Sequence, residues 1–172
     1  MRTRLSRLSK LIEKWPLPPL EVAALVANVA EVLERAHARG AVHGHLTPRV
    51  ISVSPGARPM QVFVGDWAHA PRGVEPRQDI RALGVVAYQA LYGSFPVAGA
   101  PLVFPRGVPD AAVALVRWLL TSKAVPTANE VRATALDVEA ALALDEQVEE
   151  LADDMLELLD DVTASAASSH VA

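Results

Sequence analysis

The stretch QDIRALGVVAYQALYGSFP, residues 78–96, is the segment that decides the fold. From Asp79 to Tyr92 its pattern is helical and apolar on nearly all sides, which predicts a helix buried in the core. Gly93 follows the last helical position and Pro96 comes soon after, so we expect the helix to end there. A buried carboxylate must be hydrogen-bonded, so Asp79 at the start of this helix is expected to find donors in another segment.

The sequence on both sides predicts further helices and one small hairpin. The additional helices are expected over residues 3–15, 21–37, 110–121 and 128–144. Two short β-branched runs, Val50–Val53 and Gln61–Val64, flank the turn sequence SPGARP and are typical of a β-hairpin. The fold class predicted from this pattern is mainly α, with residues 1–144 as a single domain.

Composition limits the class of protein. A chain of 172 residues is long enough for one domain with a real core. Without cysteine there can be no disulfides, no thiol catalysis and no zinc held by thiolates. No apolar run approaches the ~20 residues of a membrane helix, and the charged N-terminus is unlike a secretory signal. We therefore expect a cytoplasmic protein that binds neither nucleic acid nor membrane.

The acids gather near the C-terminus. Residues 145–161 hold nine acids and no base, although the whole chain carries only −4, so the remainder is positive. We predict an acidic amphipathic helix over 145–162, followed by a disordered tail over 163–172. Its apolar stripe is expected to bind a partner and consists of Val148, Leu151, Met155, Leu158 and Val162. The stripe could instead fold back on its own domain or pair with a second copy.

The order of these elements resembles the C-terminal lobe (C-lobe) of the eukaryotic-like, or Hanks-type, bacterial Ser/Thr protein kinases. The segment VHGHLTPRVISV, residues 42–53, is similar to the family's catalytic loop, His-Arg-Asp-Leu-Lys-Pro-x-Asn, and the strand after it. VFVGDWAHA, residues 62–70, lies where the family has Asp-Phe-Gly, and residues 78–96 resemble its buried central helix. The resemblance implies that Asp79 caps this helix and binds the backbone of residues 43–45. It also implies that His43 packs near Trp67.

Several catalytic positions of the family hold other residues here. The family's catalytic Asp accepts the proton of the substrate hydroxyl, and its Asn holds a magnesium ion. The resemblance matches these positions to His45 and Val50, in a loop that begins at His43, and matches Asp66 to the magnesium-binding Asp. We find no Gly-rich loop, which belongs to the family's N-terminal lobe. From these departures we expect no N-terminal lobe, no ATP binding and no enzymatic activity.

The two histidines also allow a metal site. His43, His45, Asp66 and His69 could converge, since the two loops are neighbours in the family, and imidazoles with a carboxylate bind zinc or iron. The competing interpretation is a degenerate catalytic loop with a structural His43 and a solvent-exposed His45. We favour the second interpretation and expect neither metal nor cofactor.

The predicted function is that of a catalytically inactive, single-lobe pseudokinase. It would act as an adaptor, scaffold or inhibitor in bacterial signalling or assembly, with a protein partner or through self-association. Without an N-terminal lobe, apolar hairpin positions such as Ile51 and Val53 would face water unless other helices or a partner covered them. Two alternatives remain: a metal-dependent enzyme using His45 and Asp66, and the C-lobe subunit of a split kinase.

Overall fold

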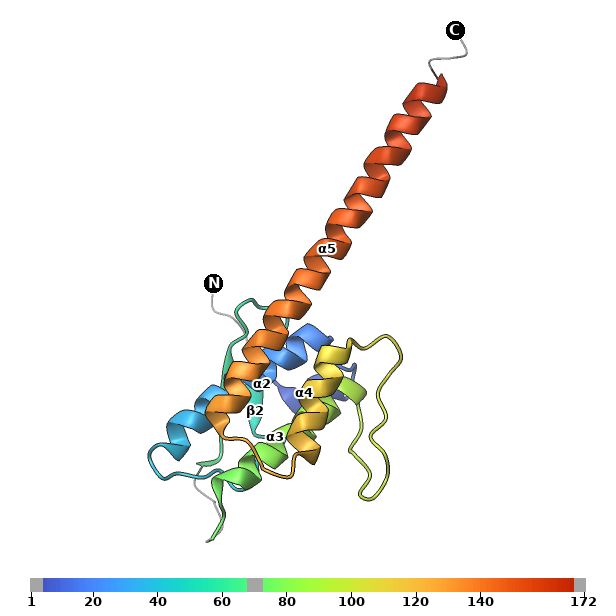
Figure 1. Cartoon of the computed structure of the whole chain (residues 1–172). Helices are drawn as coiled ribbons and strands as arrows, with labels where there is room; N and C mark the ends of the chain where they lie inside the picture. Colours follow the sequence, from blue (N-terminus) through green and yellow to red (C-terminus); the bar gives the residue numbers. More distant parts are fainter. Residues whose placement is uncertain (1–4, 68–72, 169–172) are drawn as a thin grey trace.

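The computed structural model describes residues 5–67 and 73–168, with side chains described as far as residue 159 (Figure 1). The helices of this part are α1 (Leu8–Ile12), α2 (Pro19–His37), α3 (Pro76–Tyr92), α4 (Asp110–Thr121) and α5 (Ala128–Ser168). The strands are β1 (Ser6–Arg7), β2 (Ile51–Val53) and β3 (Val62–Val64). The mainly α fold class with a small hairpin is confirmed.

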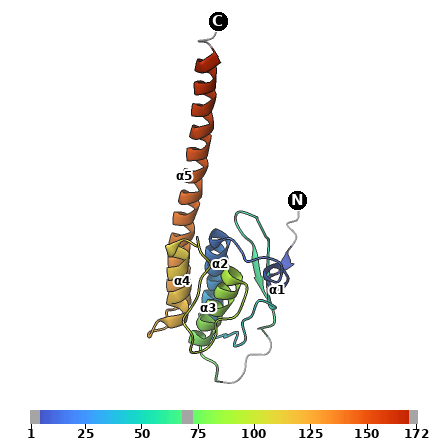
Figure 2. The same cartoon turned by 90° about the vertical axis from the view of Figure 1, so that its right-hand side faces the viewer.

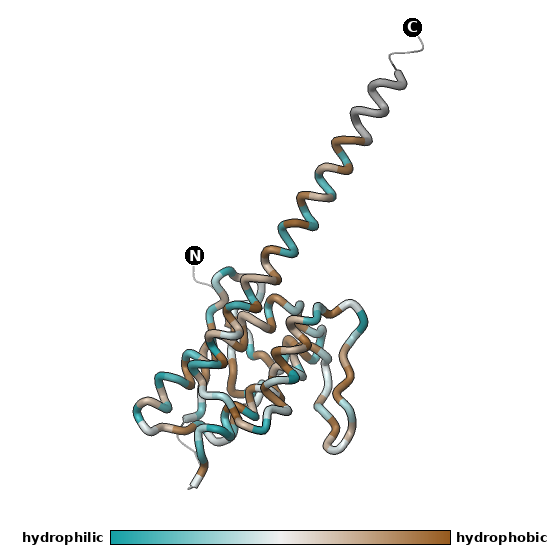
Figure 3. Tube along the Cα trace, in the orientation of Figure 1, coloured by the Kyte–Doolittle hydropathy of each residue, from teal (hydrophilic) through white to brown (hydrophobic). Residues whose placement is uncertain are grey.

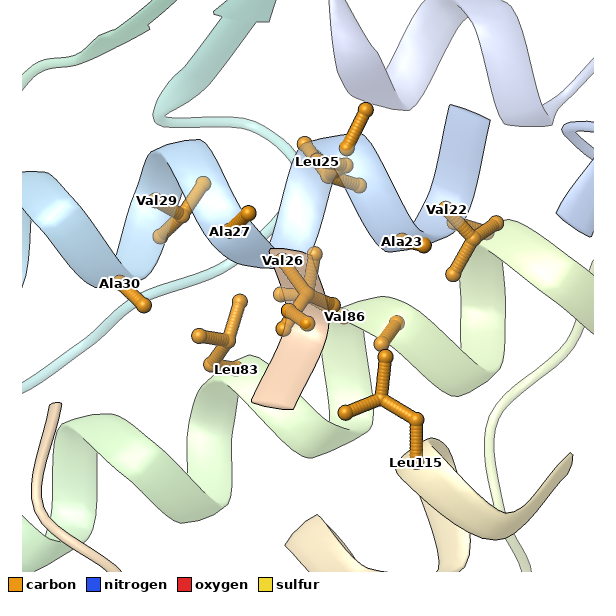
Figure 4. Packing of buried hydrophobic residues seen from close by; sticks show 14 of the residues in the cluster. Val22, Ala23, Leu25, Val26, Ala27, Val29, Ala30, Leu83, Val86 and Leu115 are labelled. Carbon is orange, nitrogen blue, oxygen red and sulfur yellow. The ribbon is translucent and has the colours of Figure 1, made fainter. Parts of the chain in front are cut away.

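Helix α2 lies at the centre of the core. Pro19 occupies its first position, where the missing N–H would have had no helical partner. From Leu20 to Ala30 nearly every side chain is buried, because α2 is covered by α3, α4, β3 and the first part of α5. Figure 4 shows Val22, Val26 and neighbouring α2 side chains packed among Leu83, Val86 and Leu115 of the surrounding helices. The aliphatic run of this helix is therefore the hydrophobic centre of the molecule.

Helix α3 is the buried helix expected from residues 78–96. Its N-cap is Glu75, which forms a reciprocal capping box with Gln78, so the expectation that Asp79 caps the helix is wrong. Asp79 lies inside the first turn, where its side chain is free to reach another segment. The helix ends at Gly93, whose φ of 83° is a left-handed conformation that glycine adopts without steric cost.

The sheet has three antiparallel strands in the order β1-β2-β3. Ile51 pairs with Val64 and Val53 with Val62, as expected of a hairpin. The expected helix over residues 3–15 is shorter than predicted, because residues 6–7 pair with β2 and only Leu8–Ile12 are helical. Backbone pairing with an exposed strand edge therefore competes with the helical pattern at this end, and residues 1–4 lie outside the described part.

Helix α5 (Ala128–Ser168) is a single helix where the sequence pattern predicts two, over residues 128–144 and 145–162. Its N-terminus carries a second capping box, in which Thr127 N–H donates to Glu130 Oε2 at 2.7 Å and Glu130 N–H to Thr127 Oγ1 at 3.3 Å. Up to Leu142 the helix packs on the body, and from Leu144 to Leu159 its side chains are exposed. Figures 1 and 2 show this second part projecting beyond the body from both directions.

The end of α5 differs from the expected disordered tail. Disorder is predicted over residues 163–172, whereas the helix continues to Ser168 and residues 169–172 lie outside the described part. Three of the six residues 163–168 are Ala, and alanine extends an existing helix readily because helix growth needs no new nucleus. We call residues 144–168 the α5 extension.

Candidate functional site

Asp79 holds the loop of residues 43–45 in place. Its Oδ2 accepts a hydrogen bond from His43 N–H at 2.8 Å, and its Oδ1 accepts one from Gly44 N–H at 2.7 Å. His37 Nε2, at the end of α2, lies 2.8 Å from the same Oδ2. The side chain of Asp79 is fully buried, so these three contacts satisfy a carboxylate that water does not reach. The backbone contacts follow the arrangement that the resemblance implies.

The side chain of His43 is held by burial, a hydrogen bond and a ring contact. It is completely buried, and its Nε2 lies 2.9 Å from the carbonyl oxygen of Gly65. Its ring stands edge-on to Trp67 with a centroid distance of 4.9 Å, and Trp67 Nε1–H donates to the carbonyl of Val64 at 2.8 Å. These contacts join the 43–45 loop to the segment after β3.

His45 and Asp66 form the exposed part of the site. His45 Nε2 lies 3.2 Å from Asp66 Oδ2, and the side chains are 33% and 48% exposed. Asp66 has a φ of 62°, an uncommon conformation for a residue other than glycine. His45 and Asp66, the two positions matched to catalytic carboxylates of the family, thus lie together at one surface. Val50, the position matched to the magnesium-binding Asn, is half-buried and packs against the core.

Of the four residues predicted to lie close together, His43, His45, Asp66 and His69, the structure describes the first three. His43, His45 and Asp66 come close together, but His43 already bonds Gly65, and His69 lies outside the described residues. Among residues 5–67 and 73–159, the side chains offer no group of three or more potential metal ligands.

Two contacts at this end of the molecule were missed from the sequence. His37 was not singled out, although a histidine at the last position of a buried helix can reach a neighbouring carboxylate. Arg81 was also missed; its guanidinium donates to the carbonyl oxygen of Leu119 at 2.6 Å and to that of Ser122, at the end of α4. A positive charge at a helix C-terminus satisfies free carbonyl groups, so Arg81 locks α3 to α4.

The hairpin does not expose the apolar positions singled out from the sequence. Ile51 is 0% and Val53 1% exposed, because both pack into the core of the chain itself. The outward position of the hairpin is instead Phe63, which is 61% exposed. Of the two alternatives, cover by the chain's own elements or by a partner, the first is therefore the one that the structure shows for Ile51 and Val53.

A small cleft of about 90 Å³ lies between the start of α2, the hairpin turn and α5. Its lining includes Arg58, Met60 and Glu139. Burial raises the pKa of the Glu139 carboxyl, and the neighbouring Arg58 partly offsets this effect. The cleft is small and its charged groups are of opposite sign, so it forms part of the packing between α5 and the body.

The large exposed apolar surface lies on the α5 extension. Val148, Leu151, Met155 and Leu158 are 57–64% exposed, and the side chain of Val162 lies outside the described part. Figure 3 shows apolar positions recurring along this projecting segment between hydrophilic ones. For these four residues, the possibility that the stripe folds back on its own domain is not realised in the structure.

The buried helix α3 is anchored through Asp79 to the loop of residues 43–45, which precedes the hairpin of β2 and β3. Together with the surrounding helices, this arrangement defines a protein-kinase C-lobe-like domain. The comparisons with known proteins agree with this class. No family model matches the chain. The serine/threonine-protein kinase Pkn1 of Myxococcus xanthus is 33% identical over a region that covers 49% of this chain and 17% of that kinase.

Solved structures give the same fold. The crystal structure of the Mycobacterium tuberculosis PknI kinase domain aligns with a TM-score of 0.61 at 21% identity, covering 80% of this chain and 64% of that domain. A double mutant of the PknI domain aligns with a TM-score of 0.63 at 20% identity, covering 80% and 63%. The predicted relationship to bacterial Hanks-type Ser/Thr kinases is confirmed over part of the chain. The chain spans less than two thirds of each of these relatives.

The prediction that the chain is not an enzyme is contradicted by these comparisons. The relatives are Ser/Thr kinases, so the relationship points towards enzymes. The prediction relied on the missing Gly-rich loop and on the residues at the positions of the catalytic Asp and Asn, His45 and Val50. The Gly-rich loop belongs to a part of the kinase domain that a C-lobe does not contain, so its absence does not bear on activity.

No helix among the described residues has both the length and the apolar character needed to cross a membrane.

Proposed function

We propose that this chain is a protein-interaction module of a bacterial signalling pathway, working in the cytoplasm as a scaffold or adaptor. Its body has the C-lobe fold, and the α5 extension is its association surface. The observation that carries the proposal is the row of exposed apolar side chains on that extension, from Leu144 to Leu159.

The physical argument rests on the cost of exposed apolar surface. Large exposed apolar patches on a folded protein mark sites of interaction. This patch lies on a projecting helix, so a partner can approach it without meeting the body (Figure 2). The kinase relationship supports a place in signalling, because the curated relative is itself named a serine/threonine-protein kinase.

The test is affinity isolation of the tagged full chain from its native host, after mild cross-linking, with mass spectrometry of the bound proteins. The variant Leu151→Asp with Leu158→Asp places charges on the apolar side, and we expect it to lose the proteins that the wild type retains. The control, Glu150→Asp with Glu157→Asp, places the same residue on the opposite side and should retain them. Far-UV circular dichroism should show a folded body in both. An identical set of bound proteins in all three samples would contradict the proposal.

The contact between His45 and Asp66 favours a second candidate, a metal-dependent activity. An imidazole and a carboxylate 3.2 Å apart at a surface can supply two ligands to a divalent ion, with water or substrate completing the set. Zinc and manganese should then raise the melting temperature of the full chain, and His45→Asn or Asp66→Asn should remove the effect. An equal response of the wild type and both variants would exclude this candidate.

A further inference from the structure

The α5 extension carries a row of large apolar side chains that the body does not bury. Beyond Leu142, which is 4% exposed, the large apolar side chains described on α5 are all more than half exposed. They are Leu144, Val148, Leu151, Met155, Leu156, Leu158 and Leu159. Figures 1 and 2 show that the extension projects beyond the body. Only its first turns, up to Glu149, border the body, at a hollow that Val148 shares with Leu20 and Pro109.

The apolar and acidic residues of the extension lie on opposite sides of the helix. At 100° per residue, the seven apolar side chains fall within an arc of roughly 160°, broader than the seam of a simple two-stranded coil. Eight of the nine acids of residues 145–161 fall on the other side, and only Asp145 lies within the apolar arc. We call these sides the apolar face and the acidic face.

This separation argues against a basic helix as the partner that covers the apolar face. A helix that met the acidic face would leave the apolar face in water. A helix that covered the apolar face would gain little from its own basic charges, because most of the acids point away from the contact. Charge complementarity therefore does not select the partner, and the apolar face must be covered by a surface that is itself apolar.

We propose that the occupant is a second copy of this chain, which associates with the first through the apolar faces of the two extensions. This inference rests on the proposed function, since it names the partner of the same surface. A second copy supplies an apolar face of identical length and breadth, as a symmetric pair requires. The acidic faces then point outwards on opposite sides of the pair, where a separation near or above the ~10 Å Debye length weakens their repulsion.

The size of the contact is sufficient for a stable pair. Seven large side chains, each more than half exposed, offer roughly 700 Å² per chain, close to the ~800 Å² per partner of a standard interface. Pairing also stabilises the helix itself. Acids four residues apart repel along the extension, for example Glu146 with Glu150 and Glu149 with Asp153, and apolar contacts with a second copy offset this repulsion.

Sedimentation equilibrium of the full chain over a range of concentrations tests this directly. We expect an equilibrium between monomer and dimer for the wild type. Leu151→Gln with Leu158→Gln should weaken association about 100-fold or more, because four large apolar side chains leave each dimer interface. The matched control, Glu150→Gln with Glu157→Gln, introduces the same residue on the acidic face and should associate at least as tightly as the wild type.

Added salt gives a second measurement. Association through apolar faces should hold or tighten as salt rises, because salt screens the remaining repulsion between acids. Weakening by salt would overturn the assignment, since it would mean that charged contacts hold the copies together. A monomeric wild type at every concentration would overturn it as well, as would equal effects of the two double variants.

These outcomes are separable from those of the proposed function. If the purified chain is monomeric while the host isolation still depends on Leu151 and Leu158, self-association is wrong and the interaction function stands. If the chain dimerises through the apolar face but retains no other protein from the host, the inference stands and the adaptor function fails.

Discussion

Asp79 shows how one residue can position a loop that has no regular structure of its own. The loop of residues 43–45 has no ladder partner for its backbone N–H groups, and a buried N–H without an acceptor is costly. The carboxylate accepts from two of these groups and also contacts His37, so a single side chain satisfies the loop and joins it to α2 and α3. The exposed His45 and the buried His43 both depend on this anchor.

We therefore expect Asp79→Ala to lower the free energy of unfolding by about 2–4 kcal/mol, because it leaves two buried N–H groups and His37 without their acceptor. Asp79→Asn retains one carbonyl acceptor and should cost less. Urea denaturation followed by circular dichroism measures both values. A midpoint for Asp79→Ala equal to that of the wild type would show that the loop is not held in this way.

At the residue scale, the sequence predicted a contact where a buried polar group must have a hydrogen-bond partner. The buried carboxylate had to find donors, and the resemblance indicated which loop would supply them. The burial of Ile51 and Val53 was not predictable in the same way, because the two faces of a three-residue strand cannot be distinguished until its neighbours are known. His45 and Asp66 were expected to be close from the resemblance alone.

At the scale of elements, the contact of α3 with α4 depends on a glycine. A Cβ added at Gly84 would lie 2.9 Å from Leu119 Cβ, closer than such atoms approach in folded proteins, and 3.1 Å from Leu120 Cδ2, which is tighter than most such contacts. Arg81 ties the same two helices through the carbonyl groups at the end of α4. The two helices therefore approach closely at Gly84.

Gly84→Ala distinguishes packing from helix propensity. Propensity alone would stabilise α3 by about 1 kcal/mol, whereas overpacking costs about 1–3 kcal/mol. We expect packing to dominate, with a net loss of up to about 2 kcal/mol measured by thermal or urea unfolding. A gain in stability would mean that α4 can move away freely and that the close contact is unimportant.

The N-terminus of α5 gives a prediction about pH. Hydrogen bonds from Thr127 N–H and Oγ1–H to Glu130 hold the pKa of that carboxyl below its usual value. A lowered pKa in the folded state adds stability above the unfolded value of about 4.3, and this contribution is lost as the pH falls through the folded value.

Glu130→Gln keeps an acceptor for Thr127 N–H but does not titrate. Between about pH 5 and pH 3, the free energy of unfolding should therefore fall less steeply for Glu130→Gln than for the wild type. Chemical denaturation at several pH values measures this slope. Equal slopes would indicate that the capping box is not formed in solution.

The elements themselves were largely predictable because their patterns are long and end at clear signals. Helices α2, α3 and α4 begin or end at Pro or Gly, and the hairpin strands flank a turn sequence. The first helix was predicted too long because pairing of residues 6–7 with β2 is a tertiary contact, which a local pattern does not contain. The continuity of α5 was obscured because its sequence changes from mixed to acidic near residue 145 without any residue that would end a helix.

On the scale of the whole molecule, two parts of different character share one helix. The first part of α5 completes the core of a kinase C-lobe-like body, and the second carries an apolar face into solvent (Figure 3). Truncation after residue 144 should therefore leave the body folded and cost less than about 1 kcal/mol. The ion pair that it removes, Arg58 with Glu146, is exposed, and exposed pairs contribute little. Circular dichroism and urea unfolding of the truncated chain check this, and loss of cooperative unfolding would show that the extension supports the body.

Hydrogen exchange of the full chain, followed by mass spectrometry, tests the central claim most directly. The claim is that the α5 extension is an association surface. An unpartnered helix rich in like charges should fray and exchange rapidly, whereas an associated one is protected. At high protein concentration we predict protection across residues 144–168 that is lost on dilution and in Leu151→Gln with Leu158→Gln, while the part of α5 before residue 144 stays protected throughout. Rapid exchange of residues 144–168 at every concentration, at the rate of an unstructured chain, would contradict the account.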